Sequence, residues 1–101
     1  MDQQDLAALD DDALAHLAVT LAEEERHVSK RREVLQARID FVRGGGATSE
    51  AHAAEQLHEL KSQEQDVSKA RHLLHARISE VEVERARRAV ARADAQPHAT
   101  A

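Results

Sequence analysis

The chain is short, acidic and almost free of aromatic side chains. It has 101 residues, a net charge of −5, one Phe, no Trp, no Tyr and no Cys. This length excludes more than one domain, and the lack of Cys excludes a disulfide framework. Few Gly and Pro beside abundant Ala, Leu, Glu and Arg are typical of long or coiled-coil helices. Such a chain buries little apolar surface, so we expect modest stability.

The charges are unevenly distributed along the chain. Residues 1–24 hold seven acidic and no Lys or Arg side chains, whereas residues 25–42 hold five basic and three acidic ones. Direct DNA or RNA binding, which needs a broad basic face, is therefore disfavoured, but a small anionic ligand is permitted. No segment has the ~20 apolar residues of a membrane span, and no signal segment is recognisable. We expect a cytoplasmic protein without a membrane partner.

The predicted elements follow in chain order. Residues 1–10 are expected to be flexible or to form a short N-terminal turn. The acidic residues 10–12 provide an N-cap and a first turn for a helix over 11–43, in which apolar residues recur at helical spacing. A Gly-rich turn over 44–48 ends that helix, with Thr48 or Ser49 as the next N-cap. A second helix over 49–94 and a disordered tail over 95–101 complete the chain. Residues 11–94 thus predict an all-α fold, an antiparallel two-helix coiled-coil hairpin.

An internal repeat is the most informative feature of the sequence. Residues 25–42 and 64–81, 39 positions apart, are identical at ten of eighteen positions. A repeat in so short a chain indicates a duplicated unit. Half of the identities are polar, although a duplicated packing element would need only the apolar ones. The shared polar residues therefore indicate a ligand site.

The polar residues of each copy form a stripe along one side of a helix, which we call the polar stripe. In the first copy it spans roughly 80° of the helix circumference. Arg can pair with phosphate or with a guanine edge or stack on a purine, and a carboxylate can accept the guanine N–H groups that adenine lacks. The stripe therefore fits a guanine nucleotide with a phosphate. It consists of Glu25, Ser29, Arg32, Gln36 and Asp40 in the first copy and Glu64, Ser68, Arg71, His75 and Ser79 in the second.

The hairpin would relate the two stripes by a pseudo-two-fold axis. If the turn is centred near residues 45–48, Glu25 faces Ser68, Ser29 faces Glu64, and the axis passes near His27 and Asp66. A two-fold symmetric ligand, or a pair of ligands, would match such a surface. The alternative is that the stripe is a solvated face of charge pairs four residues apart. The protein would then be a ligand-independent coiled-coil adaptor or scaffold.

The first stripe also carries a family resemblance. Glu25, Ser29, Arg32, Gln36 and Asp40 match in full the E-x3-S-x2-R-x3-Q-x3-D motif of the RsiG-type anti-sigma factors of actinobacteria, and residues 14–81 as a whole resemble that family. The resemblance implies an antiparallel coiled coil that binds a cyclic di-GMP dimer, one motif per helix. It also implies that the loaded protein sequesters a sigma factor of the WhiG group, which is FliA-like, and so blocks transcription.

The second copy departs from this motif. His75 stands in place of Gln, and Ser79 stands in place of Asp. His75 can still donate a hydrogen bond, but Ser79 cannot make a charged contact with guanine. The second half-site is thus either weaker or shared with the partner. Family members with one motif form homodimers and twin-motif members act as monomers, so the resemblance implies a monomer here, with a homodimer as the alternative.

Other features have simpler interpretations. Seven His residues lack the spacing of a metal site, and the two helices offer no concave catalytic arrangement, so we expect neither a metal nor an enzyme. The apolar residues Val34, Phe41 and Leu73 lie away from the stripe, as a second packing face or as scattered surface residues. A basic C-terminal end compensates the helix dipole or docks on an acidic partner. It comprises Arg85, Arg87, Arg88 and Arg92.

Overall fold

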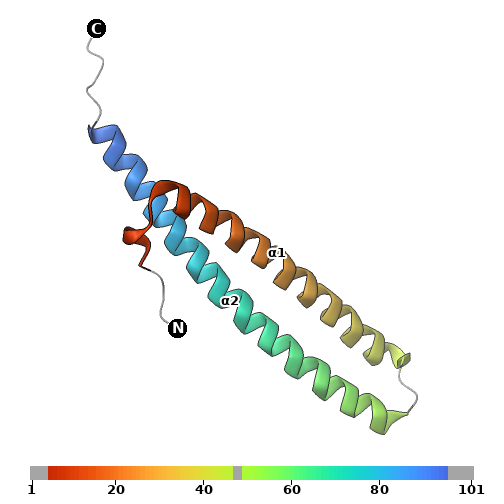
Figure 1. Cartoon of the computed structure of the whole chain (residues 1–101). Helices are drawn as coiled ribbons and strands as arrows, with labels where there is room; N and C mark the ends of the chain where they lie inside the picture. Colours follow the sequence, from red (N-terminus) through yellow and green to blue (C-terminus); the bar gives the residue numbers. More distant parts are fainter. Residues whose placement is uncertain (1–4, 47–48, 96–101) are drawn as a thin grey trace.

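The protein is a helical hairpin in which two long helices run antiparallel (Figure 1). The computed structural model describes residues 5–46 and 49–95. In order, these residues form the 3-10 helix η1 (Leu6–Ala8), α1 (Asp11–Phe41), the wider turn η2 (Val42–Gly46) and α2 (Glu50–Ala95). The all-α hairpin predicted from the sequence is confirmed. Residues 1–4, 47–48 and 96–101 lie outside the described part; they hold portions of the expected N-terminal segment, of the Gly-rich turn and of the tail.

The helix ends are set by short-range chemistry. The Asp10 side chain accepts a 2.7 Å hydrogen bond from the amide of Ala13, and Ser49 Oγ accepts one of 3.1 Å from the amide of His52. These are N-caps of α1 and α2, which satisfy amides that have no partner inside the helix. Of the two residues expected as the N-cap of α2, Ser49 is therefore the one that caps the helix. The expected first helix ran to Arg43, but α1 ends at Phe41 and η2 carries the chain onward.

The turn requires glycine at one position. Gly45 has a φ of 96°, in the left-handed region that side chains with a Cβ rarely adopt. It thereby breaks the helical path and lets the chain reverse direction. A Cβ on Gly46 would collide with the ring of Phe41, so this second glycine makes room for the only aromatic side chain of the sequence.

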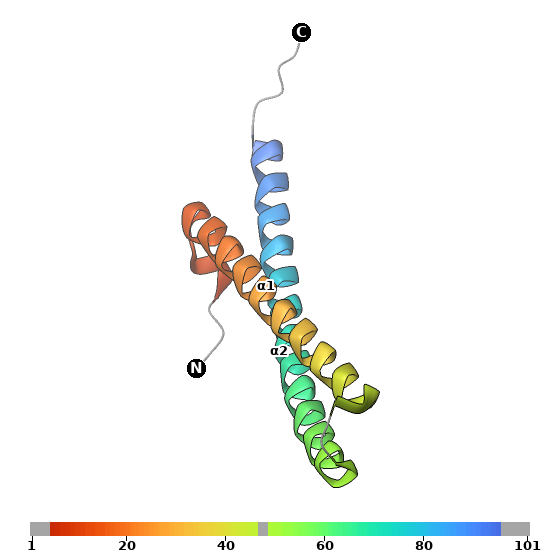
Figure 2. The same ribbon diagram turned by 90° about the vertical axis from the view of Figure 1, so that its right-hand side faces the viewer.

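The apolar seam between the helices is thin. Among the described residues no polar or charged side chain is buried, and the buried apolar ones are Leu14, Leu21, Leu35, Ile39, Val42, Val67 and Val81. The helices cross at the middle of the molecule (Figure 2). With 46 residues against 31, α2 is longer than α1 by roughly 20 Å at the usual rise per residue, and its C-terminal end extends beyond α1.

At the end away from the turn, which we call the open end, residues 5–10 form a strap that folds back on α2. Leu6 and Leu9 pack against the cluster around Leu14 and Val81. Arg88 fastens the strap, because its guanidinium donates to the carbonyl oxygens of Leu6 at 2.9 Å and Leu9 at 2.7 Å. The turn at the opposite end, the closed end, has no such cover among the described residues.

Candidate functional site

A cluster of polar side chains joins the two helices at the middle of the hairpin. Arg71 of α2 donates from Nε to Ser29 Oγ at 3.2 Å, and its Nε lies 3.5 Å from Glu25 Oε2. The same Glu25 oxygen accepts hydrogen bonds from Ser29 Oγ at 2.6 Å and from His75 Nε2 at 3.0 Å. Two residues of the first sequence copy therefore bond with two of the second.

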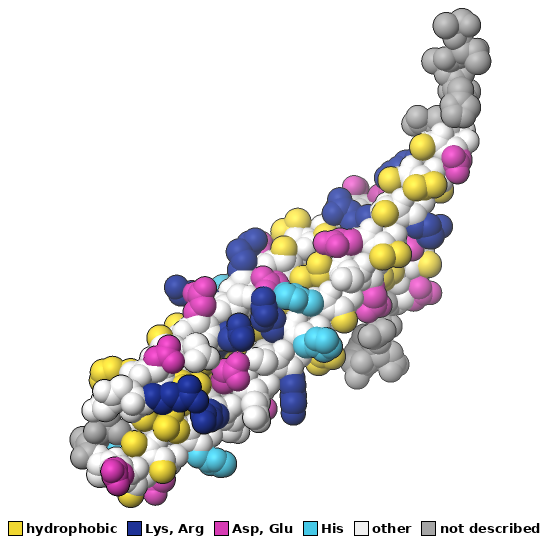
Figure 3. Space-filling model, turned by 180° about the vertical axis from the view of Figure 1, so that it is seen from behind, with side chains coloured by type: hydrophobic (Ala, Val, Ile, Leu, Met, Phe, Trp, Pro, Cys, Tyr) yellow, Lys and Arg dark blue, Asp and Glu magenta, His cyan; other side chains and the backbone are white. Residues whose placement is uncertain are grey.

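A matching cluster lies further along the same face of the hairpin. Arg32 Nε of α1 is 3.5 Å from Glu64 Oε1 of α2, and Ser68 Oγ donates to the same Glu64 oxygen at 2.9 Å. Gln36 lines a shallow hollow of about 270 Å³ together with Glu64. Basic, acidic and histidine side chains gather along the middle of the rod, as Figure 3 shows for one face.

These two clusters are related by the repeat. Moving each residue by 39 positions between the copies turns the Glu25–Arg71 pair into the Glu64–Arg32 pair, and both pairs have the same 3.5 Å separation. The expected pseudo-two-fold relation between the stripes is therefore present in this geometry. We call the two clusters half-sites. The first contains Arg32, Gln36, Asp40, Glu64 and Ser68; the second contains Arg71, His75, Ser79, Glu25 and Ser29.

The facing pairs predicted from the sequence are wrong. Glu25 was expected to face Ser68 and Ser29 to face Glu64, but both α1 residues contact Arg71 instead. Measured by the Glu25–Arg71 ion pair, the partner on α2 lies three residues beyond the expected one, which is less than one helical turn of 3.6. The cause is the connector: η2 extends to Gly46 and α2 begins only at Glu50, so the point of reversal lies later in the chain than assumed.

With this register the axis also moves. It passes between residues 28 and 29 of α1 and between residues 67 and 68 of α2, instead of near His27 and Asp66. Because the helices are antiparallel, each half-site combines the Glu and Ser of one copy with the later motif residues of the other. The substitutions in the second copy, His75 and Ser79, therefore both fall in the second half-site.

The outer residues of the stripes are less closely connected. Gln36 Nε2 donates to Asp40 Oδ1 at 3.3 Å along α1, so this pair stays on its own helix. Ser79 lies at the edge of a shallow depression near Leu6 and Val83, close to the strap. The structure brings nine of the ten stripe residues into direct polar contacts with each other, in pairs or clusters; Asp40 contacts Gln36, and Ser79 is exposed.

Glu25 is the most perturbed carboxylate of the stripe. The hydrogen bond from Ser29 and then that from His75 lower its pKa from 4.5 to about 2, with Arg71 adding a smaller attraction. Glu25 is therefore ionised at neutral pH and acts only as an acceptor. Its side chain is 24% exposed and that of Arg71 is 38% exposed, so an incoming ligand can reach both groups.

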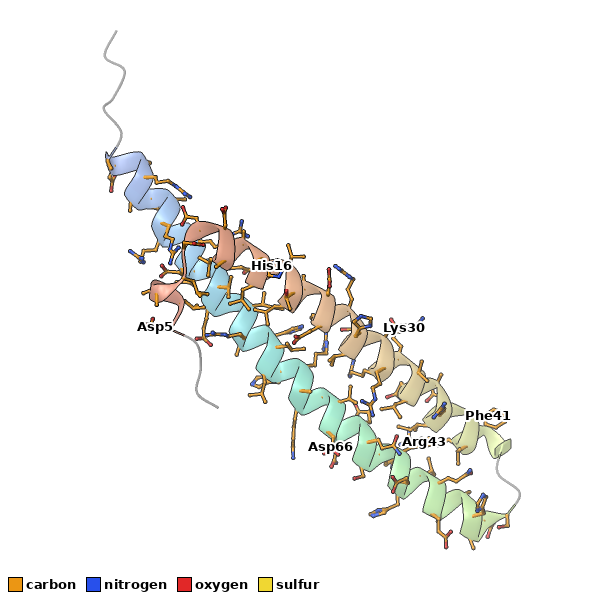
Figure 4. The ribbon with its side chains drawn as sticks, viewed as in Figure 1. Asp5, His16, Lys30, Phe41, Arg43 and Asp66 are labelled. Carbon is orange, nitrogen blue, oxygen red and sulfur yellow. The ribbon has the colours of Figure 1, made fainter. Side chains whose placement is uncertain are left out.

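Two cations beside the first half-site were not anticipated. Arg43 and Lys61 line the hollow that also contains Gln36 and Glu64. Figure 4 labels Arg43 near the closed end, and this residue belongs to the wider turn η2. Both lie just outside the two copies, and the positions 39 residues away hold Glu82 and Ala22, so the repeat could not reveal them. They give the first half-site additional positive charge that the second lacks.

The basic C-terminal end makes ion pairs within the chain, which were not predicted from the sequence. Arg88 and Arg92 pair with Asp11 at 2.9 and 2.8 Å, and Arg87 pairs with Glu84 at 2.7 Å. The acidic partner is thus the N-terminal part of the same chain. The signal was present in the sequence: an acidic N-terminal third and a basic end of the second helix meet at the open end of any antiparallel hairpin.

In residues 5–46 and 49–95, no group of three or more His, Asp or Glu side chains is placed to hold a metal ion. No helix in the same part of the chain has the length and apolar character needed to cross a membrane. The arrangement of Arg, carboxylate and hydroxyl groups on an open surface suits binding of a charged, hydrogen-bonding ligand.

A comparison with family models identifies the family. The RsiG-like model matches residues 1–60, which is more than half of the chain. The chain belongs to the RsiG-like family. The match includes the complete first motif and ends before the second copy at residue 64. No curated protein and no solved structure matches the chain. Membership of the RsiG-like family indicates an anti-sigma factor, whose partner is a sigma factor.

Proposed function

We propose that this RsiG-like protein binds a dimer of cyclic di-GMP across its polar stripe and in that state sequesters a WhiG-type sigma factor. The observation that carries the proposal is the two-fold relation of the Arg32–Glu64 and Arg71–Glu25 pairs. Cyclic di-GMP is itself two-fold symmetric, and a pair of such molecules presents guanines and phosphates in symmetric positions. A surface with two related Arg and carboxylate clusters suits that ligand.

The contacts inside each half-site can be exchanged for contacts with the ligand. Arg32 is 47% exposed and its Nε lies 3.5 Å from Glu64, which is longer than a close charge-assisted hydrogen bond. In the proposed complex, Arg32 turns to phosphate or stacks on guanine, and Glu64 accepts from the guanine N1–H and N2–H₂ groups. Arg71 and Glu25 have the same roles in the second half-site.

The two half-sites are expected to differ in affinity. The first has Asp40 as an additional carboxylate and the cations Arg43 and Lys61 nearby. The second has Ser79 at the position related to Asp40, and its His75 is already bonded to Glu25. We therefore expect one ligand position to fill before the other.

Binding on an open surface also provides a route to control the partner. A nucleotide lying on the stripe remains accessible and can form part of the surface that the sigma factor contacts. The affinity of each is then raised by the presence of the other, by the same factor. Cyclic di-GMP would in this way decide whether the sigma factor is held or free for RNA polymerase.

The decisive experiment is isothermal titration of the purified protein with cyclic di-GMP and, separately, with cyclic di-AMP. Each titration is run with and without a WhiG-type sigma factor. We expect guanine-selective binding, two ligands per hairpin and tighter binding in the presence of the sigma factor. One ligand per hairpin, or two per pair of chains, would restrict the proposal to the first half-site or to a homodimer. No binding under either condition would refute it and leave a ligand-independent adaptor as the function.

A further inference from the structure

A groove at the closed end of the hairpin is separate from both half-sites. It has a volume of about 440 Å³ and lies between the end of α1, the turn η2 and the first turns of α2. Its apolar lining includes Phe41, Val42 and Leu60, and its polar lining includes the carboxylates of Glu55 and Glu59 together with Arg38 and His52. An apolar floor with a charged rim is the usual organisation of a protein-binding patch.

Phe41 is placed for contact with another molecule. It is the only aromatic residue of the chain, and its side chain is 67% exposed. Figure 4 shows it at the closed end of the hairpin. The ring lies against Gly46, where a Cβ would collide with it, so the turn leaves it room and limits its movement. An exposed aromatic ring held against a turn loses little conformational freedom when a partner binds.

The open end shows how this fold covers such a surface. There the strap places two apolar side chains one turn apart, Leu6 and Leu9, against the seam, and Arg88 fastens it through hydrogen bonds to their carbonyl oxygens. At the closed end no described residue covers Phe41 in that way. Arg38 also lines the groove, but Glu55 and Glu59 form no ion pair with any residue in 5–46 and 49–95, so both carboxylates can accept a cation from a partner.

We propose that the groove receives an amphipathic helical segment of the sigma factor, with two apolar residues about one turn apart and Lys or Arg beside them. This inference rests on the proposed function and assigns part of its partner interface. The basic side chains would pair with Glu55 and Glu59, and the apolar ones would pack on Phe41 and Leu60. The strap of a second copy is a poor occupant because it carries Asp5 and Asp10, which Glu55 and Glu59 repel.

The test compares variants of the full chain in binding to a purified WhiG-type sigma factor at saturating cyclic di-GMP. Phe41→Ala should weaken sigma binding about tenfold or more, as expected for an aromatic side chain at the centre of an interface. Replacing both Glu55 and Glu59 by Lys should weaken sigma factor binding more than Phe41→Ala does. Val90→Ala is the matched control: Val90 is 61% exposed and lies on the far part of α2, and its variant should bind normally.

Ligand binding and self-association are measured on the same samples. Cyclic di-GMP affinity in the absence of the sigma factor should be unchanged in all three variants, because none of these residues belongs to a half-site. Normal sigma binding by Phe41→Ala would overturn the groove assignment while leaving the proposed function intact. A wild-type protein that does not bind the sigma factor would overturn both. Dimerisation in sedimentation that is lost in Phe41→Ala would instead assign the groove to a second copy and refute this inference.

Discussion

The arginines of the open end and those of the polar stripe use the same chemistry under different constraints. Arg88 is 15% exposed and makes hydrogen bonds of 2.7 to 2.9 Å with two carboxylates and two carbonyl oxygens. Arg32 and Arg71 are 47% and 38% exposed and lie 3.5 Å from their carboxylate partners. An arginine whose donors all make short hydrogen bonds inside the protein therefore has a structural role. An exposed arginine at a longer distance from its carboxylate is available to a ligand.

The largest effect should come from removing a stripe arginine. Arg32→Ala deletes the cation of the first half-site, and we expect cyclic di-GMP affinity to fall about 100-fold, as for loss of one partner of a charged contact. Helicity should be unchanged, because Arg32 is an exposed residue on a helix and Ala is a strong helix former.

Lys30→Ala is the matched control for this experiment. It removes the same charge from the same helix, but Lys30 is 77% exposed and pairs only weakly with Glu33, at 3.8 Å. Calorimetry and circular dichroism would be compared for both variants. Equal ligand affinities for Arg32→Ala and the wild type would show that the stripe assignment is incorrect.

Removing Arg88 should instead lower the stability of the fold and leave ligand affinity nearly unchanged. Arg88→Ala removes the hydrogen bonds that hold the carbonyls of Leu6 and Leu9 to α2, together with one of the ion pairs of Asp11. We expect the melting temperature to fall by roughly 5 °C or more, while cyclic di-GMP affinity stays within a few-fold of the wild type. Arg85→Ala, one turn earlier on α2, is the control and should melt nearly as the wild type does. The comparison fails if both variants have the same melting temperature.

A smaller effect should follow from restoring the second half-site. Ser79→Asp supplies the carboxylate that the first half-site has in Asp40, and we expect the weaker ligand to bind about tenfold more tightly. Ser62→Asp adds the same charge to α2 at an exposed position outside the stripe and should leave that affinity unchanged or slightly reduced. Calorimetric titration resolves the two binding steps. An unchanged second step in Ser79→Asp would mean that the half-sites do not read guanine through this position.

The smallest effect should be on the stability of the protein at acidic pH. The folded-state pKa of Glu25 is about 2 against an ordinary 4.5, so the unfolded chain binds more protons at this group between these values. The stabilisation by Glu25 is therefore complete above pH 4.5 and is lost as the pH falls toward 2. Glu25→Gln should reduce the slope of melting temperature against pH in this range. Glu33→Gln, at a largely exposed carboxylate, is the control, and equal slopes for the two variants would contradict the assignment.

The sequence supports much of this picture because its signals are local. Asp10 and Ser49 cap the helices as their residue types suggest, and Gly45 adopts the backbone conformation that a reversal needs. The polar stripe is also a local property, since residues three and four positions apart share one side of a helix. The ligand roles of the ten stripe residues stay predictions until binding is measured.

The register was less accessible from the sequence. The turn was assumed to begin after Arg43, yet a wider turn over Val42–Gly46 delays the reversal, and Glu25 meets Arg71 instead of Ser68. Such a shift costs the helices little individually, because each keeps its own hydrogen bonds. It depends on how the two apolar surfaces and the connector fit together, and no periodicity within one helix records that fit.

By itself, the sequence determined the helical class, the positions of the caps, the repeat and the kinds of side chain on the stripe. These properties follow from backbone propensity and from the 3.6-residue period, which act within a few residues. Only the tertiary structure decided that each half-site draws on both copies, that Arg88 fastens the N-terminal strap, and that Phe41 stays exposed over a groove. Those outcomes join residues that are far apart in the chain, so they depend on the register and packing of two helices rather than on either one alone.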